Sequence, residues 1–438
     1  MKFERPRGTR DFSPSDMERR DYILSQLRKV FESYAFERIE TPVFEHTELF
    51  TTKSGQEITE NLYTFKDKSG RDLCLRPELT ASVARMYVSE LAHMRKPVKL
   101  YYFGPMYRYE RPQKGRYREF WQAGAELIGV EDYGADAEIV CLAADCLDRL
   151  GLRYELRLSH LGIIRGLLSD FGLSEEKQDE VLGLLDRDEL EQVGDFIRKD
   201  AEYNLLKNLM EKKSSTYKDH SKLLKTISSE LKGYGDAIFA IGELEKIVDL
   251  LVGQEINFIV DLGLSRGLSY YTDFVFDVRV EGLGAQDQVC GGGRYDNLIE
   301  LFGGQPTPAV GFAFGFDRLV EALKLQGISF PEETFHVAVI PTTYEEDTVK
   351  APTNDKEYTV KDYAVKIARN LRKEGFSVDY DVAGHKLKDQ LSHASQAGVK
   401  YAVIIGPREL EKGKVVLRNM ATKEEKQVEI DKLPKKIH

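Results

Sequence analysis

Cysteine is scarce in this chain, and the few cysteines are scattered. The 438 residues include only Cys74, Cys141, Cys146 and Cys290, and no two of them form a Cys-x-x-Cys pair. This spacing supports neither a zinc knuckle nor a redox motif, and sparse cysteines fit a reducing cytoplasm. The histidines are scattered too, without a His-Glu-x-x-His motif or a Cys/His cluster, so we expect no protein-bound metal.

Long apolar runs and a positive net charge are also missing. No run approaches the roughly 20 apolar residues of a membrane helix. The N-terminus, MKFERPRGTRDF, has no apolar segment like that of a secretory signal, and its early acidic residue does not fit a transit peptide. We therefore expect a cytoplasmic protein with no membrane partner. The formal net charge of -10 argues against an indiscriminate nucleic-acid coat protein, although a local basic patch for a specific RNA remains compatible with it.

The chain has an ordinary globular composition, and its patterns divide it into four regions. With 42% hydrophobic and 31% charged residues, a chain of this length is expected to form two or three domains. Residues 1–159 contain an amphipathic helical pattern, MERRDYILSQLRKVFESYAF, and two strands joined by a polar loop, which predict a hairpin. Residues 160–250 are periodic at helical spacing, which predicts a helical insertion. Residues 251–326 return to strands and glycine, and residues 332–438 alternate strand and helix, which predicts a small α/β domain.

The second strand of the predicted hairpin, EFWQAGAELIGV, carries polar groups on one face. Because side chains alternate along a strand, Gln122, Gly124 and Glu126 share a face, and the residues between them form an apolar face. Antiparallel pairing with the first strand, KLYYFGPMYRYE, would bring Arg108 towards Gln122. These residues indicate the floor of a binding site; the alternative is a solvated hairpin whose charges face water.

Two glycine-containing stretches suggest further parts of a site. LGLSRGLSYYTDF places Arg266 in an apolar strand ahead of Tyr270 and Tyr271, and a buried arginine is costly unless it meets an anion. A structural salt bridge is the alternative. CGGGRYD, which contains Tyr295, predicts a tight turn or a close approach of the backbone to a ligand. Neither the Rossmann nor the P-loop glycine fingerprint is present.

Two more stretches place a charged residue at the start of a helix. In GFAFGFDRLVEAL, glycines on a strand-like run precede Arg318, which suits a flat base and a phosphate; helix–strand packing with an exposed arginine is the alternative. In CLRPELTASVARM, Glu78 and Thr80 precede a helix, where Glu78 could equally be a cap. Taken together, the arginines, acids and glycines suit phosphate chemistry by positioning and charge stabilisation. No Ser/His/Asp or Cys/His set offers a nucleophile.

These stretches resemble the motifs of class II aminoacyl-tRNA synthetases, in the form found in histidyl-tRNA synthetases. ERIETPVFE, centred on Pro42, resembles motif 1, the dimer-forming element. GPMYRYERPQKGRYREFWQAGAE resembles motif 2, and PAVGFAFGFDRL resembles motif 3. SRGLSYYTDFVF and CGGGRYD resemble the two signatures specific to the histidine enzyme, and RGTRDF and the C-terminal region are similar as well. The resemblance covers essentially the whole chain.

The resemblance implies an α+β fold and a ligase activity. The fold would be a mixed, mainly antiparallel sheet flanked by helices, with a helical insertion and a C-terminal α/β anticodon-binding domain. The enzyme would form histidyl-adenylate and pyrophosphate from histidine and ATP, and then transfer histidine to the terminal ribose of tRNA(His) with release of AMP. ATP is then a substrate that binds with Mg²⁺, for which we assign no protein ligands. The expected assembly is a homodimer.

The resemblance also implies roles at the ATP end of the site. Arg108 would hold the α-phosphate and the histidine carboxylate, and Arg266 would act from the other side in place of a catalytic metal. Arg318 and Arg116 would face the β- and γ-phosphates. The expected catalytic residues are Arg108, Arg266 and Arg318. The expected ATP-binding residues are Arg108, Glu110, Arg116, Phe120 and Arg318, with Phe120 stacked on adenine and Glu110 at its amino group. Gln113 and Arg118 would lie near the acceptor end of tRNA.

At the histidine end, the resemblance implies a polar pocket. Its residues would be Glu78, Thr80, Arg108, Gln122, Glu126, Arg266, Tyr270, Tyr271 and Tyr295. Glu78, Thr80 and Gln122 would bind the α-amino group and backbone of histidine. Glu126, Tyr271 and Tyr295 would contact the imidazole, which can both donate and accept a hydrogen bond. An apolar isostere would leave these polar groups unpaired and would be rejected.

The chain departs from the family pattern at two positions, and two rival functions stay open. Ser269 stands where an Asp is usual, so another acid would have to supply that charge, and Asp273 replaces a usual glycine. The main rival is a non-catalytic, histidine-sensing regulatory subunit of ATP phosphoribosyltransferase. Such relatives generally lack the anticodon domain and lose the motif 2 arginines, whereas both are present here. A synthetase for threonine, proline or glycine is the other rival, and the two histidine signatures argue against it.

Overall fold

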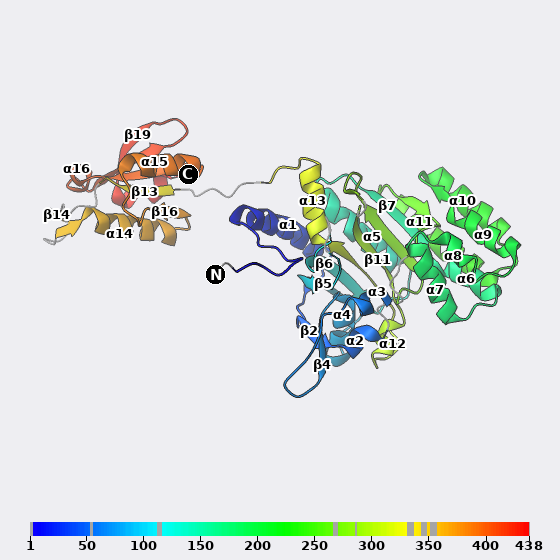
Figure 1. Cartoon of the computed structure of the whole chain (residues 1–438). Helices are drawn as coiled ribbons and strands as arrows, with labels where there is room; N and C mark the ends of the chain where they lie inside the picture. Colours follow the sequence, from blue (N-terminus) through cyan, green and yellow to red (C-terminus); the bar gives the residue numbers. More distant parts are fainter. Residues whose placement is uncertain are drawn as a thin grey trace. The chain divides into compact units, whose positions relative to one another are not determined.

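The computed structural model shows two compact units, Met1–Phe330 and Pro331–His438 (Figure 1). The structure describes residues 3–52, 56–111, 116–265, 270–284, 287–330, 337–342, 348–350 and 357–437, without the side chains of residues 56, 57, 217 and 348–350. Gln113, Arg266 and Ser269, which the sequence singled out, lie outside the described residues. Within the described ranges, no helix combines the length and apolarity that a membrane span requires.

A mixed, mainly antiparallel sheet forms the centre of the first unit, as predicted. Among the described residues its strand order is β1-β5-β6-β12-β11-β10-β7-β9-β8. The pairs β1–β5 and β7–β9 are parallel and the others are antiparallel. The strands are β1 (Glu37–Arg38), β5 (Val98–Tyr107), β6 (Glu119–Ile128), β7 (Glu155–His160), β8 (Lys213–Ser214), β9 (Ile259–Asp261), β10 (Phe274–Arg279), β11 (Gln288–Arg294) and β12 (Ala309–Gly315).

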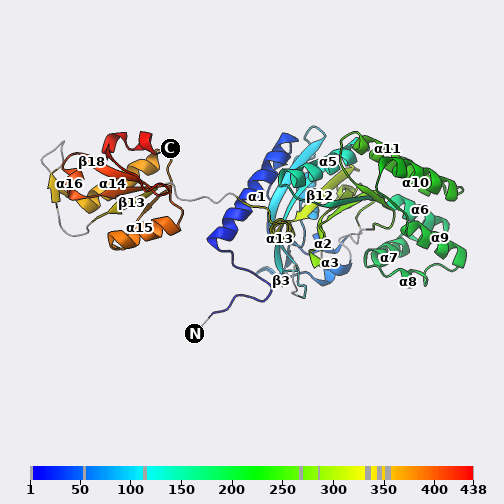
Figure 2. The same cartoon turned by 90° about the horizontal axis from the view of Figure 1, so that it is seen from above.

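The predicted hairpin is confirmed as β5 and β6, with Gly104 opposite Gln122 and Leu100 opposite Glu126. The apolar face of β6, formed by Ala123, Ala125 and Leu127, lies in the same buried core as α1 (Pro14–Ser33) and α5 (Gly134–Arg149). Figure 2 shows these helices along the sheet. The opposite face of β6 is therefore the one that remains for a ligand.

Helix α1 confirms the amphipathic pattern read from the sequence. Ser13 caps it through a capping box with Asp16, and Pro14 occupies the first turn, where its missing N–H costs no helical hydrogen bond. The buried side is regular at helical spacing and includes Ile23, Leu27, Val30 and Phe31. This burial holds α1 against the sheet and so places the N-terminal segment beside the site.

Residues 160–250 are mainly helical, as predicted, with the short strand β8 between two of the helices, and they continue the first unit. The helices are α6 (Leu161–Asp170), α7 (Glu175–Asp186), α8 (Leu190–Val193), α9 (Asp200–Met210), α10 (Tyr217–Glu230) and α11 (Gly235–Val252), drawn in green in Figure 1. Apolar residues of α6 and α11, such as Ile163 and Leu244, share the buried core of α5. The division of this region as a separate insertion stays a prediction.

A second, three-stranded sheet lies on the motif 1 side of the first unit. Its order is β2-β4-β3, with β2 (Phe44–His46), β3 (Thr64–Lys66) and β4 (Asp72–Leu75). Phe44 is 55% exposed and Phe65 is 43% exposed, and their rings pack edge to face with centroids 6.5 Å apart. The two rings therefore lie together on the surface of this sheet.

The C-terminal unit is a small α/β domain, as predicted. Strands β13 (Val337–Pro341), β16 (Val378–Tyr380) and β17 (Tyr401–Ile405) are parallel, and β18 (Lys414–Asn419) and β19 (Glu425–Glu429) add two antiparallel strands. Val337 and Val339 pack with α14 (Val360–Lys373), whereas Ala338 and Ile340 pack with α15 (Leu387–Gln396). Because side chains alternate along β13, the two helices cover opposite faces of this sheet.

Candidate active site

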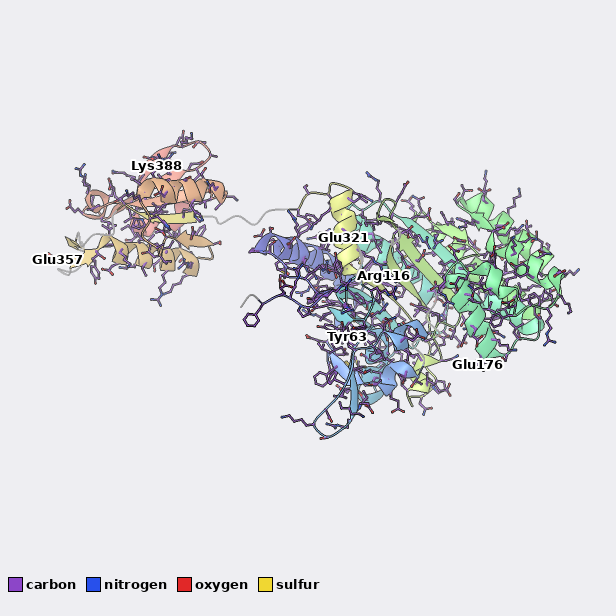
Figure 3. All side chains as sticks on the ribbon, in the orientation of Figure 1. Tyr63, Arg116, Glu176, Glu321, Glu357 and Lys388 are labelled. Carbon is purple, nitrogen blue, oxygen red and sulfur yellow. The ribbon has the colours of Figure 1, made fainter. Side chains whose placement is uncertain are left out.

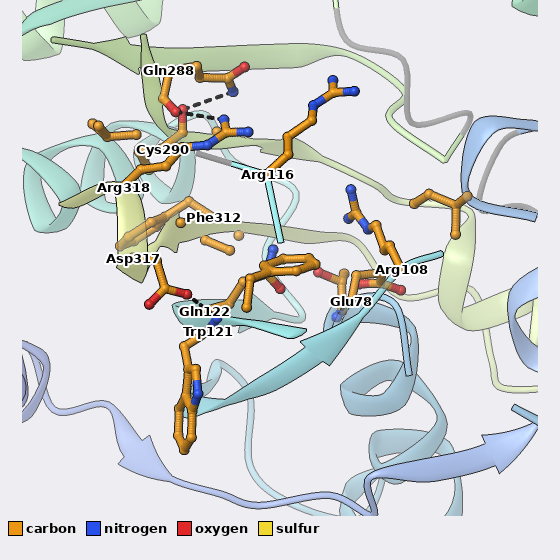
Figure 4. Close-up of a pocket in the computed structure, with 18 of the residues that line it drawn as sticks. Glu78, Arg108, Arg116, Trp121, Gln122, Gln288, Cys290, Phe312, Asp317 and Arg318 are labelled. Carbon is orange, nitrogen blue, oxygen red and sulfur yellow. Dashed lines mark hydrogen bonds between the residues drawn. The ribbon is translucent and has the colours of Figure 1, made fainter. Parts of the chain in front are cut away.

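A pocket opens over the free face of β6, β11 and β12, between the turn before α4 (Thr80–Met86) and the start of α13 (Phe316–Leu325). It brings together nearly all the described residues that the sequence selected. These are Glu78, Thr80, Arg108, Glu110, Arg116, Phe120, Gln122, Glu126, Tyr270, Tyr271, Tyr295 and Arg318. Figure 4 shows Arg116 between Arg318 and Arg108 around the cavity. The hairpin face and the four other stretches selected from the sequence therefore form one site.

One predicted residue lies outside the lining of this pocket. Arg118 donates from Nε to the Glu110 carbonyl at 3.2 Å, and its guanidinium lies 4.1 Å from the centroid of the Tyr109 ring. Asp273, the other departure from the family pattern, contributes its carbonyl to the Leu161 N–H at 2.8 Å and is not part of the lining.

Glu126 is the centre of the polar end of the pocket. Its Oε2 accepts from the Tyr295 hydroxyl at 2.6 Å, and its Oε1 accepts from Thr80 at 2.9 Å and from Tyr102 at 3.0 Å. The residue is 1% exposed. Burial raises the pKa of Glu126 to about 8, against the opposing effect of the three hydroxyl donors. This carboxyl can therefore take up or release a proton near neutral pH.

A glycine on the neighbouring strand makes room for that carboxyl. Gly311 lies opposite Glu126 in the β6–β12 register. A Cβ at position 311 would overlap Glu126 Oε2, so any larger residue would force the carboxyl to move. The glycine-lined floor expected from the sequence is thus a direct steric requirement of the Glu126 side chain.

Glu78 caps the start of α4, and its role in the site stays a prediction. Its carboxylate accepts hydrogen bonds from the backbone N–H groups of Thr80 and Ala81, the latter at 3.0 Å, at the start of α4. Burial raises the pKa of Glu78. The same side chain lines the pocket, next to Arg108, whose Nε donates to the Pro77 carbonyl at 3.0 Å. The helix cap holds an acid beside a catalytic candidate.

The opposite end of the pocket collects positive charge. Arg318 Nη1 donates to the Gln288 carbonyl at 3.0 Å, and Glu110 lies 3.4 Å from Arg116 Nε and 3.8 Å from Arg108 Nη1. Burial lowers the pKa of Arg318, and the neighbouring guanidinium of Arg116 lowers it further. Mutual repulsion among these cations would be relieved by an anionic ligand. The Arg108 guanidinium also lies 5.2 Å from the Phe120 ring centroid.

The pocket contains residues that the sequence interpretation missed. Tyr117, Trp121, Gln288 and Asp317 line it, as does Asp186 at the end of α7. Asp317 precedes Arg318 directly, and that adjacency was a usable signal. Asp186 lies in the region expected to be a separate insertion, and its sequence neighbourhood carries no signal for a site.

Activating a carboxylic acid with ATP requires cations for the triphosphate at one end of a cavity and a selective polar pocket for the acid at the other. Class II aminoacyl-tRNA synthetases meet this requirement on the face of a mainly antiparallel sheet, and the present fold and pocket define that class. The histidyl-tRNA synthetase family profile matches residues 8–319, and an anticodon binding domain profile matches residues 336–438. The chain belongs to the histidyl-tRNA synthetase family.

Individual proteins agree with this placement. The histidine–tRNA ligase of Archaeoglobus fulgidus is 45% identical over 97% of both chains. The solved structure of apo S. aureus histidyl-tRNA synthetase matches with a TM-score of 0.71 and 28% identity over all of both chains. A Bacillus halodurans structure described as an ATP phosphoribosyltransferase regulatory subunit/histidyl-tRNA synthetase matches with a TM-score of 0.73 and 27% identity, over 92% of this chain and 98% of that one.

Proposed function

We propose that the chain joins histidine to ATP in this pocket and then transfers histidine to its tRNA. The observation that carries the proposal is the placement of Arg108, Arg116 and Arg318 in the same cavity as the Glu126 hydroxyl cluster. Each end alone has a structural explanation. Their combination fits a substrate with a polar ring and a carboxylate, next to a substrate with several phosphates.

In the first step, a carboxylate oxygen of histidine attacks the α-phosphorus of ATP. A new P–O bond forms, the bond to pyrophosphate breaks, and histidyl-adenylate remains. Arg108 stabilises the charge on the α-phosphate, and Arg116 and Arg318 stabilise the departing pyrophosphate. Phe120 stacks on adenine with Glu110 at its amino group. Mg²⁺ enters with ATP, and we assign it no protein ligand. Arg266 keeps the role opposite Arg108 that the family resemblance implies.

Histidine is selected at the other end of the pocket. Glu126, Tyr271 and Tyr295 contact the imidazole, and Glu78, Thr80 and Gln122 hold the α-amino group and backbone. A carboxyl whose pKa is about 8 can accept a proton from, or donate one to, a ring that itself titrates near pH 6.5. Tyr270 completes the wall, with its ring centroid 5.0 Å from that of Tyr271 and 6.0 Å from that of Tyr295.

In the second step, a hydroxyl of the terminal ribose of tRNA(His) attacks the adenylate carbonyl, and AMP leaves. The match of residues 336–438 to an anticodon binding domain supports RNA as the acceptor. Gln113 and Arg118 belong to the motif 2 stretch of the sequence, and we assign them to the acceptor end. The same domain favours the ligase over a histidine-sensing regulatory subunit, because such relatives generally lack it.

The assembly is a homodimer in the cytoplasm. Its supporting observation is the exposed pair Phe44 and Phe65 on the motif 1 side of the molecule, which a second copy would cover. No disulfide links Cys74, Cys141, Cys146 and Cys290, in agreement with a reducing compartment.

A charging assay tests the proposed function. The purified chain is expected to attach histidine to a transcript of tRNA(His) in the presence of ATP and Mg²⁺. Arg108→Ala is expected to lose this activity by at least roughly a hundredfold, because a cation at the reacting phosphate is removed. Arg111→Ala is the matched control, since Arg111 is exposed in the same sequence stretch. Charging that survives Arg108→Ala would contradict the assignment of the pocket.

A further inference from the structure

The segment before α1 packs against the strand that leaves the motif 2 loop. We call residues 6–12 the N-terminal strap; Figure 2 shows this segment in dark blue ahead of α1. The Arg118 N–H donates to the Gly8 carbonyl at 2.9 Å. Gly8 has a φ of +88°, and a Cβ there would lie 2.7 Å from Arg118 Cγ. Glycine is therefore required at this position both for its backbone conformation and for the close approach.

Arg10 of the strap contacts two residues that line the pocket. Its guanidinium carbon lies 3.4 Å from the centroid of the Tyr117 ring, and its Nη2 lies 2.8 Å from Asp317 Oδ1. Tyr117 follows Arg116 in the chain, and Asp317 precedes Arg318. The Tyr117 hydroxyl also reaches Glu321 of α13 at 3.5 Å, a residue labelled in Figure 3 near Arg116. Arg10 thus touches the direct neighbours of both arginines.

Asp317 has enough other partners to remain paired without Arg10. Arg20 Nη1 lies 2.6 Å from Asp317 Oδ1, and the Trp121 N–H donates to Oδ2 at 2.8 Å. Arg20 is itself held by aromatic rings, at 4.2 Å from the Phe12 centroid and 4.8 Å from the Phe316 centroid. Removing Arg10 therefore leaves no unpaired buried charge, which is the usual cause of large destabilisation. What is lost is the bridge from Asp317 to Tyr117.

We propose that Arg10 is a positioning residue that fixes Arg116 and Arg318 relative to each other. It stacks on Tyr117 and pairs with Asp317, so the exit of the motif 2 loop and the first turn of α13 keep one arrangement. This inference rests on the proposed function, because it requires both arginines to meet the triphosphate of ATP. Histidine binds at the other end of the pocket and is not expected to depend on Arg10.

The test compares Arg10→Ala and Arg10→Lys with the unaltered protein. Equilibrium binding of ATP with Mg²⁺, the KM for ATP and for histidine in pyrophosphate exchange, and the thermal unfolding midpoint are measured for each. Arg10→Ala is expected to weaken the Kd and KM for ATP by roughly ten- to hundredfold, as small misplacements of catalytic groups do. The KM for histidine and the unfolding midpoint are expected to stay unchanged. Lysine keeps the charge and loses the planar stacking group, so Arg10→Lys should recover part of the loss.

The matched control is Arg5→Ala in the same N-terminal segment. Arg5 pairs with the exposed Asp11 at 3.6 Å, and its removal is expected to leave ATP binding unchanged. Unaltered ATP affinity in Arg10→Ala would overturn the inference. So would an equal loss of ATP and histidine affinity together with a lowered unfolding midpoint, because that pattern indicates a purely structural role. ATP binding decides this even if the unaltered protein shows no exchange, an outcome that would contradict the proposed function instead.

Discussion

Glu126 shows at the scale of one residue how this fold builds a selective site. Three hydroxyl groups point at its carboxyl, and Gly311 leaves the space that the carboxyl occupies. Burial raises the pKa of Glu126 to about 8, so the carboxyl keeps its proton up to about that pH. The folded protein therefore carries a neutral acid at pH 7 where the unfolded chain carries a carboxylate. That arrangement lowers the stability of the folded state as pH rises.

The pH dependence of stability follows with a definite sign. Between the ordinary pKa of 4.5 and the folded value of about 8, the folded state holds one more proton at Glu126 than the unfolded state. The free energy of unfolding therefore falls by roughly 1.4 kcal/mol per pH unit in that window. Glu126→Gln removes this dependence. Urea unfolding at pH 5 and pH 8 should show the variant gaining about 4 kcal/mol on the unaltered protein.

The same variant should lose substrate affinity. Glutamine keeps the shape of Glu126 but replaces one carboxyl oxygen with an NH2 group that can only donate. One hydrogen bond of the buried cluster is then left unmade, so the KM for histidine is expected to rise roughly tenfold. Glu119→Gln is the control, because Glu119 is a carboxylate of the same strand at 3.4 Å from the Tyr107 hydroxyl. A stability difference between Glu126→Gln and the unaltered protein that does not change with pH would contradict this account.

The sequence alone predicted Glu126 and not all of its partners. Alternation along β6 was sufficient to put Glu126 on the polar face. Tyr102 reaches Glu126 from β5, and that contact depends on the register between the strands, which alternation alone does not determine. Asp186 also lines the pocket. It lies at the end of α7, about sixty residues after Glu126, and no local sequence pattern predicts the packing that brings it to the site. Local periodicity therefore predicted the floor of the site and missed part of its walls.

At the scale of elements, local signals were most informative where they agreed with one another. Helix α1 combines a capping box, Pro14 at its start and an apolar stripe, and the sequence predicted it well. The three-stranded sheet β2-β4-β3 was not predicted, because its strands are three or four residues long and pair across intervening helices. The exposure of Phe44 and Phe65 and the contact between their rings could be recognised only from the structure.

That small sheet supports a prediction about assembly. Phe44→Asp places a charge in the exposed aromatic pair, and we expect it to shift the chain from dimer to monomer in sedimentation equilibrium, because desolvating a carboxylate opposes burial. Phe239→Asp is the matched control, since Phe239 on α11 is 67% exposed and belongs to another element. A dimer that persists in Phe44→Asp, or an unaltered protein that is already monomeric, would contradict the proposed interface.

At the scale of the whole molecule, one unit contains a pocket with arginines at one end and the buried Glu126 cluster at the other, and the second unit matches an anticodon binding domain. The alternation of strands and helices was sufficient to predict the α/β fold of the second unit. The motifs with glycine and arginine indicated the mixed sheet of the first unit only through their resemblance to a known family. The strand order of the nine-stranded sheet could not be predicted from the sequence, because it depends on which distant strands pair. This division into two units agrees with the chain's membership of the histidyl-tRNA synthetase family.

Pyrophosphate exchange with each of the twenty amino acids, in the absence of tRNA, tests the central claim most directly. The claim is that the pocket activates one amino acid, histidine, through an adenylate. We expect exchange with histidine and none above background with the others. Exchange with a different amino acid would contradict the assignment of Glu126 and the tyrosines. Measurable histidine binding without any exchange would contradict the ligase itself and favour the regulatory sensor.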